Sequence, residues 1–166
     1  MAYESVHLEN SIAIENIISV HYFQYMSDFS FPGESHDFWE LVCVDRGEII
    51  AVAGDRQLAL KKGNILFHKP NEFHNVLTNG RISPSLVVIG FDCHSPCMKA
   101  FEDQLMNVQD TEKELLAKII VEARNTFDGR LDDPYQEKLV FLEKQASFGA
   151  PQLIRHYLEQ LMIHLY

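Results

Sequence analysis

Two histidines and a glutamate have the spacing of a ligand set carried by neighbouring β-strands. His36 and Glu40 stand four positions apart, and His74 follows the segment that runs from Gly63 to Pro70. A strand points alternate side chains to the same face, so residues two or four apart can converge on one interior point. Imidazole and carboxylate groups in that arrangement can coordinate a metal ion or hydrogen-bond a small polar ligand.

The two aromatic residues between His36 and Glu40 must point to opposite faces. Phe38 shares the parity of His36 and Glu40, whereas Trp39 does not. Core packing is the default role for both side chains. Phe38 is the better candidate for an aromatic wall of the site, because it lies on the face of Glu40.

Short strands must position these side chains. From about residue 17 to residue 92, runs rich in Val, Ile, Phe and Tyr are separated by Gly, Asn, Asp and Pro, which favour tight turns. Many short strands at nearly regular spacing are typical of a β-sandwich or β-barrel. The expected strands cover residues 17–26, 38–45, 48–53, 56–60, 64–68, 73–77 and 85–91.

The hydrophobic period becomes helical after residue 92. Ser95-Pro96 and Asp133-Pro134 have the pattern of a helix start, and Thr111-Glu-Lys-Glu has that of a capping box. The expected helices cover residues 96–106, 111–127, 134–146 and 151–166. The sequence thus predicts a mainly β fold with C-terminal helices.

Composition excludes several classes of protein. The 166 residues are 46% hydrophobic and 23% charged, as in an ordinary globular domain. A net charge of −10, with only 14 scattered Lys and Arg, predicts no binding of nucleic acid by this chain alone. No apolar run has the roughly 20 residues of a membrane span, and the start lacks a signal-peptide pattern. Three cysteines argue against a disulfide framework. We therefore expect a cytoplasmic protein with no membrane partner.

The two segments resemble the motifs of the cupin superfamily. Its first motif places metal ligands as His-x-His followed by Glu; here His36 and Glu40 match, and Glu34 replaces the first histidine. His74 matches the histidine of the second motif. The resemblance implies a jelly-roll barrel (a double-stranded β-helix) over residues 1–94 and a helical segment over residues 95–166. It also implies a divalent metal (Zn, Fe, Mn or Ni) on His36, Glu40 and His74, with Glu34 as a candidate substitute ligand.

Longer fragments are similar to the N-terminal sensor domain of AraC-type transcriptional regulators. They begin at Phe38 (FWELV), Gly63 (GNILFHKP), Asn71 (NEFH) and Val87 (VVIGFDC). In that family a cupin barrel binds a small-molecule effector, the following helices mediate dimerisation, and two helix-turn-helix units bind DNA. These 166 residues contain no such units, so the resemblance implies the non-enzymatic sensor part of a longer regulator. DNA would be bound only through the further part.

The resemblance also implies roles for particular residues. The effector would contact His36, Phe38, Glu40 and His74. The last helix carries an apolar stripe, which is usually core packing, but in this family it indicates a homodimer contact. The stripe consists of Ile154, Leu158, Leu161 and Leu165.

Three alternatives stay open at this stage. The histidines and Glu40 can form a polar cluster without a metal, because one expected ligand is missing. The chain can instead be a stand-alone cupin metalloenzyme of the isomerase or dioxygenase type, which uses the same residues. A third alternative is a purely structural dimerisation module with a closed barrel. Residues 1–16 can serve as an arm or as a lid, and the sequence does not decide between them.

Overall fold

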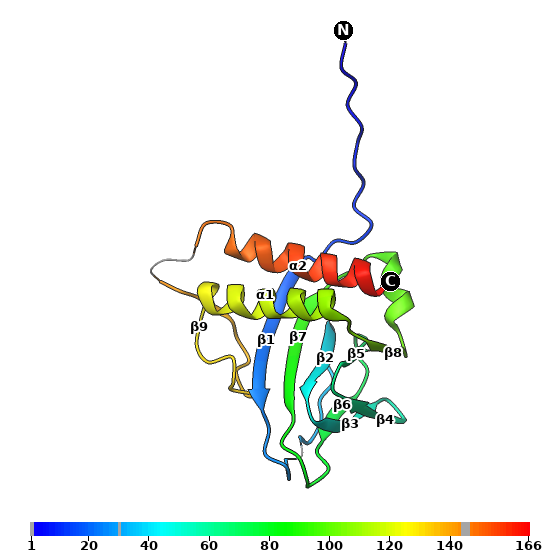
Figure 1. Ribbon diagram of the computed structural model, residues 1–166, viewed down its shortest axis with the longest axis vertical. Coiled ribbons are helices and arrows are strands. Elements are labelled where there is room, and N and C mark those ends of the chain that lie inside the picture. Colours follow the sequence, from blue (N-terminus) through cyan, green and yellow to red (C-terminus); the bar gives the residue numbers. More distant parts are fainter. Residues whose placement is uncertain (1, 30, 144–146) are drawn as a thin grey trace.

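The computed structural model describes residues 2–29, 31–143 and 147–166 (Figure 1). Seven strands occupy the first part of the chain: β1 (Asn16–Gln24), β2 (Trp39–Arg46), β3 (Glu48–Ala53), β4 (Arg56–Lys61), β5 (Asn64–His68), β6 (His74–Leu77) and β7 (Ser85–Asp92). The rest contains a 3-10 helix η1 (Pro96–Phe101), strands β8 (Leu105–Asn107), β9 (Phe127–Asp128) and β10 (Val140–Phe141), and helices α1 (Asp110–Thr126) and α2 (Ala150–Leu165).

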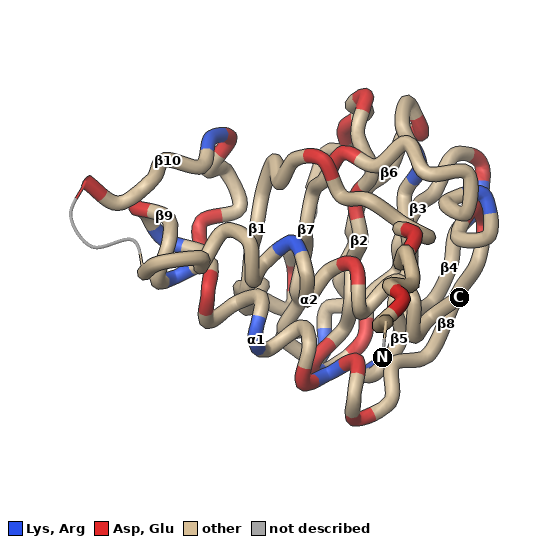
Figure 2. The backbone as a smooth tube through the Cα atoms, turned by 90° about the horizontal axis from the view of Figure 1, so that it is seen from above, with Lys and Arg blue, Asp and Glu red and all other residues tan. Residues whose placement is uncertain are grey.

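Two antiparallel sheets form the barrel, and the helices lie outside it. The larger sheet has the order β1-β7-β2-β5-β8, and the smaller has the order β4-β3-β6. Figure 2 shows α1 and α2 on one side of the large sheet and β3, β4 and β6 on the other. This confirms the expected fold class, a mainly β jelly-roll barrel followed by helices.

Alternation along β2 separates two apolar cores. Leu41 and Cys43 belong to the core between the large sheet and the helices, whereas Val42 and Val44 face the barrel interior. Trp39 is buried in the helix-side core, as the alternation predicts. One wall of strands therefore faces the helices on one side and the barrel interior on the other.

The helical part differs from the sequence expectation in three places. The segment after Ser95 is a short 3-10 helix, because the Ser95 hydroxyl accepts the N–H of Ala13 and does not cap a helix. The chain then turns at Asp103 (φ 61°) and adds β8 to the large sheet, so the barrel does not end at residue 94. At the start of α1 the capping contact is the Gln109 N–H to the Glu112 carboxylate, at 2.6 Å, rather than the expected pair two residues later.

The predicted helix over residues 134–146 is wrong for residues 134–143. The Asp133 carboxylate accepts the Tyr135 N–H at 3.0 Å, which makes an Asx turn, and β10 follows. Asp before Pro favours such turns as well as helix starts, and here the turn forms. Residues 144–146 lie outside the described residues.

The apolar stripe of α2 lies inside the chain's own core. Ile154, Leu158 and Leu161 are at most 1% exposed, and Leu165 packs beside them. They belong to the core shared by the large sheet and α1. Ile154, Leu158 and Leu161 are therefore not available to a second copy, and the prediction that they form the dimer contact is wrong for these three residues. Leu165 is only partly buried, and its part in a dimer contact stays a prediction.

The N-terminal segment leaves the body of the molecule. Ile12 and Ile14 are buried in the helix-side core, whereas residues 2–10 are exposed and extend away from it (Figure 1). No helix among the described residues is long and apolar enough to cross a membrane.

Candidate functional site

Strand register brings the predicted residues to one layer of the barrel. In β2, Glu40 lies opposite Gly90 of β7 and His68 of β5. The next layer along the barrel is apolar, with Val42 opposite Leu66. The polar layer at Glu40 thus borders the apolar filling of the interior.

A β-bridge outside the main strands places Glu34 beside His74. Glu34 and His74 exchange backbone hydrogen bonds of 2.9 Å in both directions, so their side chains lie side by side. His36 is fixed one step further along, where its carbonyl accepts the N–H of Asn71. The convergence of His36, Glu40 and His74 on one point, expected from parity, is observed.

The four side chains make a compact cluster. Glu40 lies 3.7 Å from Nε2 of His36 and 3.5 Å from Nε2 of His74, and Glu34 lies 3.8 Å from Nε2 of His74. One ligand atom from each of the four residues lies within 4.8 Å of all the others. Glu34 thus stands close enough to substitute for the missing cupin histidine.

The imidazole orientations fit a divalent cation. Nδ1 of His36 lies 3.1 Å from the Phe38 carbonyl and Nδ1 of His74 lies 2.9 Å from the Glu72 carbonyl. A carbonyl only accepts, so each Nδ1 holds the proton, and in the neutral ring Nε2 carries the lone pair. Both Nε2 atoms face Glu40 and have no hydrogen-bond partner. A metal between these nitrogens and the carboxylates would bind all of them, and it would supply Lewis acidity there.

Burial and the His–Glu contacts set the charges of the cluster. Burial acts to lower the pKa of His36, but Glu40 and Glu34 outweigh it and raise that pKa. Burial lowers the pKa of His74, and Glu40 offsets this only in part. Burial acts to raise the pKa of Glu40, but the neighbouring histidines outweigh it and lower that pKa. Near neutral pH the cluster therefore combines an ionised Glu40 with a neutral His74.

Two buried histidines of the site were not predicted. His68 is 1% exposed, stacks on His74 at 4.4 Å between ring centroids, and has Nδ1 3.5 Å from the Glu72 carboxylate. His68 is the last residue of β5, but it is buried and does not lie at the surface. His21 of β1 is also buried, and it lines the adjoining cavity. The place of His68 in the site follows from its pairing with Glu40 across β2 and β5. That pairing can be assigned only when the register of the two strands is known, so the sequence alone did not reveal it.

Phe38 lies in the site, as its parity predicts. Its ring stacks on His36 with centroids 3.6 Å apart and planes 4° apart. Gly90 makes room for it: a Cβ there would lie 2.9 Å from Phe38 Cε2 and 2.8 Å from the Ser19 hydroxyl.

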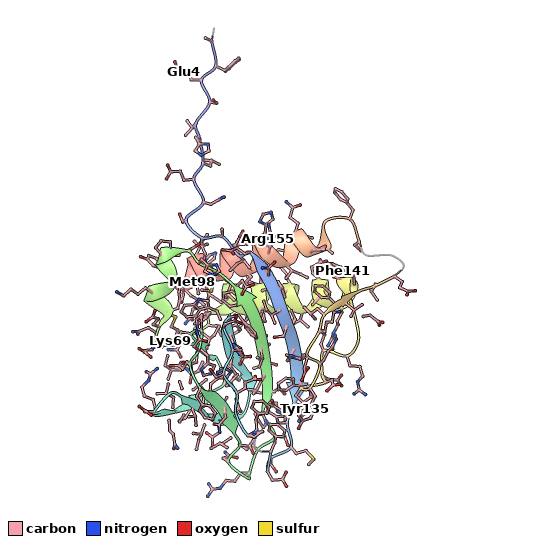
Figure 3. The ribbon with its side chains drawn as sticks, turned by 180° about the vertical axis from the view of Figure 1, so that it is seen from behind. Glu4, Lys69, Met98, Tyr135, Phe141 and Arg155 are labelled. Atoms are coloured by element: carbon pink, nitrogen blue, oxygen red, sulfur yellow. The ribbon has the colours of Figure 1, made fainter. Side chains whose placement is uncertain are left out.

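A cavity of about 320 Å³ opens beside the cluster. Its walls include Phe38, Glu40 and His74 from the barrel and residues 134–137 from the loop before β10, here called the mouth loop. Figure 3 shows Tyr135 of this loop beside β1. A cavity of this size is at the small end of ligand pockets. A second cavity of about 280 Å³ lies between α1 and the large sheet and contains none of the cluster.

Residues 16–80, which carry the cluster and six of the strands, match a family described as the AraC-like ligand binding domain. The match covers less than half of the chain, and over these residues the chain is similar to an AraC-like ligand binding domain. The sequence resemblance to AraC-type regulators is thereby confirmed.

Two curated proteins similar to part of this chain are HTH-type transcriptional activators named RhaS, from Pectobacterium carotovorum subsp. carotovorum and Pectobacterium atrosepticum. Each is 40% identical over 45 residues, which are 27% of this chain and 16% of the relative. The chain thus matches a small part of these relatives' length.

Solved structures similar to the AraC-like domain include cupins. The cupin domain of Schizosaccharomyces pombe Cnp3 has a TM-score of 0.44 and 14% identity, and the match covers 53% of this chain and 65% of that one. A cupin superfamily protein from Desulfitobacterium hafniense has a TM-score of 0.43 and 15% identity, with 53% and 84% covered.

Proposed function

We propose that this chain is the effector-sensing part of an AraC-family transcription regulator. The observation that carries the proposal is the cavity of about 320 Å³ whose wall combines apolar side chains with the Glu34–His36–Glu40–His74 cluster. Such a cavity, with few polar groups placed on an apolar wall, suits a small organic ligand. The match of residues 16–80 to a ligand binding domain supports it.

The effector would contact His36, Phe38, Glu40 and His74, and the mouth loop would close over it. A ligand shifts a conformational equilibrium only by its different affinity for the two states. The mouth loop belongs to the segment that we assigned to residues 95–166, so closure would connect the barrel to the helices. DNA binding, homodimerisation and a cytoplasmic location belong to this proposal for the whole regulator. The dimer would use a surface other than the buried α2 stripe.

The four-residue cluster favours one second candidate, a cupin metalloenzyme of the isomerase or dioxygenase type. Four ligand atoms within 4.8 Å, two of them unpartnered imidazole nitrogens, are what such an enzyme needs. A metal-containing sensor and a metalloenzyme differ in turnover, not in ligand set.

Ligand screening by thermal unfolding tests the sensor. A ligand present at 100 times its Kd adds about 2.7 kcal/mol of stability, which raises Tm by about 5–11 °C in a domain of this size. The effector should shift the unsubstituted protein and the His94→Ala control, whose histidine is exposed and outside the cluster, but not Glu40→Gln. A shift that survives Glu40→Gln in full would place the ligand elsewhere.

Metal analysis of the purified protein, combined with a turnover assay, separates the two candidates. Stoichiometric metal that is lost in His74→Ala but kept in His94→Ala, together with turnover of a bound compound, would favour the metalloenzyme. Ligand binding without turnover would favour the sensor. No ligand and no metal would contradict both and leave a structural module.

A further inference from the structure

The wall of the cavity beside the cluster carries acidic side chains but, among the described residues, no lysine or arginine. Three carboxylates line it, from Glu34, Glu40 and, in the mouth loop, Glu137. Glu137 of the mouth loop adds a third carboxyl group to the wall, and it adds to burial and to Glu40 in raising the pKa of Glu34. An anion that entered would meet three carboxyl groups.

Buried polar atoms of the wall lack partners. Nε2 of His74, whose side chain is 4% exposed, points toward Glu40 without a hydrogen bond. The side-chain oxygen of Asn75, the next residue, is also buried and unpartnered. An oxygen of this kind can only accept, and leaving it unpaired costs free energy. The wall therefore favours an occupant that donates hydrogen bonds.

Aromatic rings form much of the remaining wall. Phe23, Tyr25, Phe31 and Phe38 come from the barrel side, and Tyr135 comes from the mouth loop. Phe23 and Tyr25 contact each other with ring centroids 4.4 Å apart. The face of an aromatic ring attracts cations, and groups of such rings with carboxylates nearby are used to bind organic ammonium ions. A bare metal ion would leave these rings without a role.

We propose that the effector is a small organic cation, a primary or secondary amine with a hydrocarbon part. Its ammonium group donates to Glu34 and Glu40, and its hydrocarbon part lies against Phe38 and under Tyr135. Glu137 contributes attraction at the mouth. This inference rests on the proposed sensor function, and it adds the class of ligand.

Calorimetric titration of the full chain, freed of metal with EDTA, tests the charge preference. The probes are a series of primary amines from ethylamine to 2-phenylethylamine, with 2-phenylethanol and 3-phenylpropionate as the neutral and anionic counterparts of the largest. We expect saturable binding of at least one amine, a Kd at least tenfold weaker for the alcohol, and no binding of the carboxylate.

Variants of the mouth loop test the same point without touching the cluster. Glu137→Gln should weaken amine binding about threefold to tenfold and leave alcohol binding unchanged, whereas Glu114→Gln, an exposed change on α1, should alter neither. Tyr135→Phe should keep the affinity, and Tyr135→Leu should weaken it, because only the first keeps a flat aromatic ring over the hydrocarbon part of the ligand. Both tyrosine variants change an exposed residue, so folding is preserved.

The outcomes separate this inference from the proposed function. Binding of the alcohol or the carboxylate as tight as that of the amine overturns the cation preference but keeps the sensor. Binding of a divalent metal with no amine in the series overturns it in favour of a metal site. Absence of amine binding overturns it as well, and if the thermal screen also finds no ligand, the sensor function falls with it.

Discussion

Leu158→Ala tests whether the α2 stripe is core or interface. Leu158 is fully buried between α2, α1 and the large sheet. A leucine truncated at such a site costs about 2.7–5.0 kcal/mol, because transfer free energy is lost and a cavity remains. Each kcal/mol lowers Tm by about 2–4 °C in a domain of this size, so we expect a fall of about 5–20 °C.

Ile163→Ala is the matched control on the same helix. Its side chain is 59% exposed, so the change should cost less than about 0.5 kcal/mol and move Tm by less than about 2 °C. Circular dichroism melts give both values, and sedimentation velocity gives the oligomeric state of each variant.

The opposite pattern would refute the burial of Leu158 within one chain. If Leu158→Ala melts within about 2 °C of the unsubstituted protein but dissociates a dimer, the leucine packs against a second copy. A dimer that persists in Leu158→Ala, at a lowered Tm, would place the contact on another surface and would agree with the burial of Leu158.

Two further changes act on the site itself. Gly90→Ala would put a Cβ 2.9 Å from Phe38 Cε2 and 2.8 Å from the Ser19 hydroxyl, so Phe38 must move. We expect this change to lower the free energy of unfolding by about 1–3 kcal/mol and to reduce the rise in Tm that the effector causes. If both quantities stayed unchanged, the packing of Phe38 against Gly90 would be contradicted. Zn²⁺ affinity, measured by chelator competition, should fall as pH is lowered, because burial is outweighed by Glu40 and Glu34, which raise the pKa of His36, so that protons compete for its imidazole. An affinity that does not depend on pH down to the ordinary pKa of an imidazole would speak against His36 as a ligand.

Local patterns were sufficient to predict the strands of the barrel. β3 and β5 have the predicted bounds, because each is an apolar run limited on both sides by turn residues. The convergence of His36, Glu40 and His74 was predicted from alternation together with an assumed pairing of their segments, and the structure provides that pairing through a β-bridge and the backbone bond at His36. The mouth loop was not predictable, because Asp133-Pro134 starts turns as well as helices, and tertiary contacts decide which one forms.

The residues that sequence reasoning misplaced depended on the strand register and on which face of a strand or helix points into the core. The sequence gives His68 the opposite parity to Phe67, and the structure agrees: Phe67 lies under the helices. Which of the two faces is the interior depends on the pairing of His68 with Glu40 across β2 and β5. The stripe of α2 shows the same limit, since spacing identifies an apolar face but not what covers it.

The wall that separates the cavity from the helices is a single layer of β-strand. Phe38 and Glu40 face the cavity, and the residues that follow them, Trp39 and Leu41, contact the helix-side core. An effector that displaced Phe38 or Glu40 would therefore act one residue away from side chains that pack against the helices. The distance between the cavity and the helix-side core is the thickness of one strand.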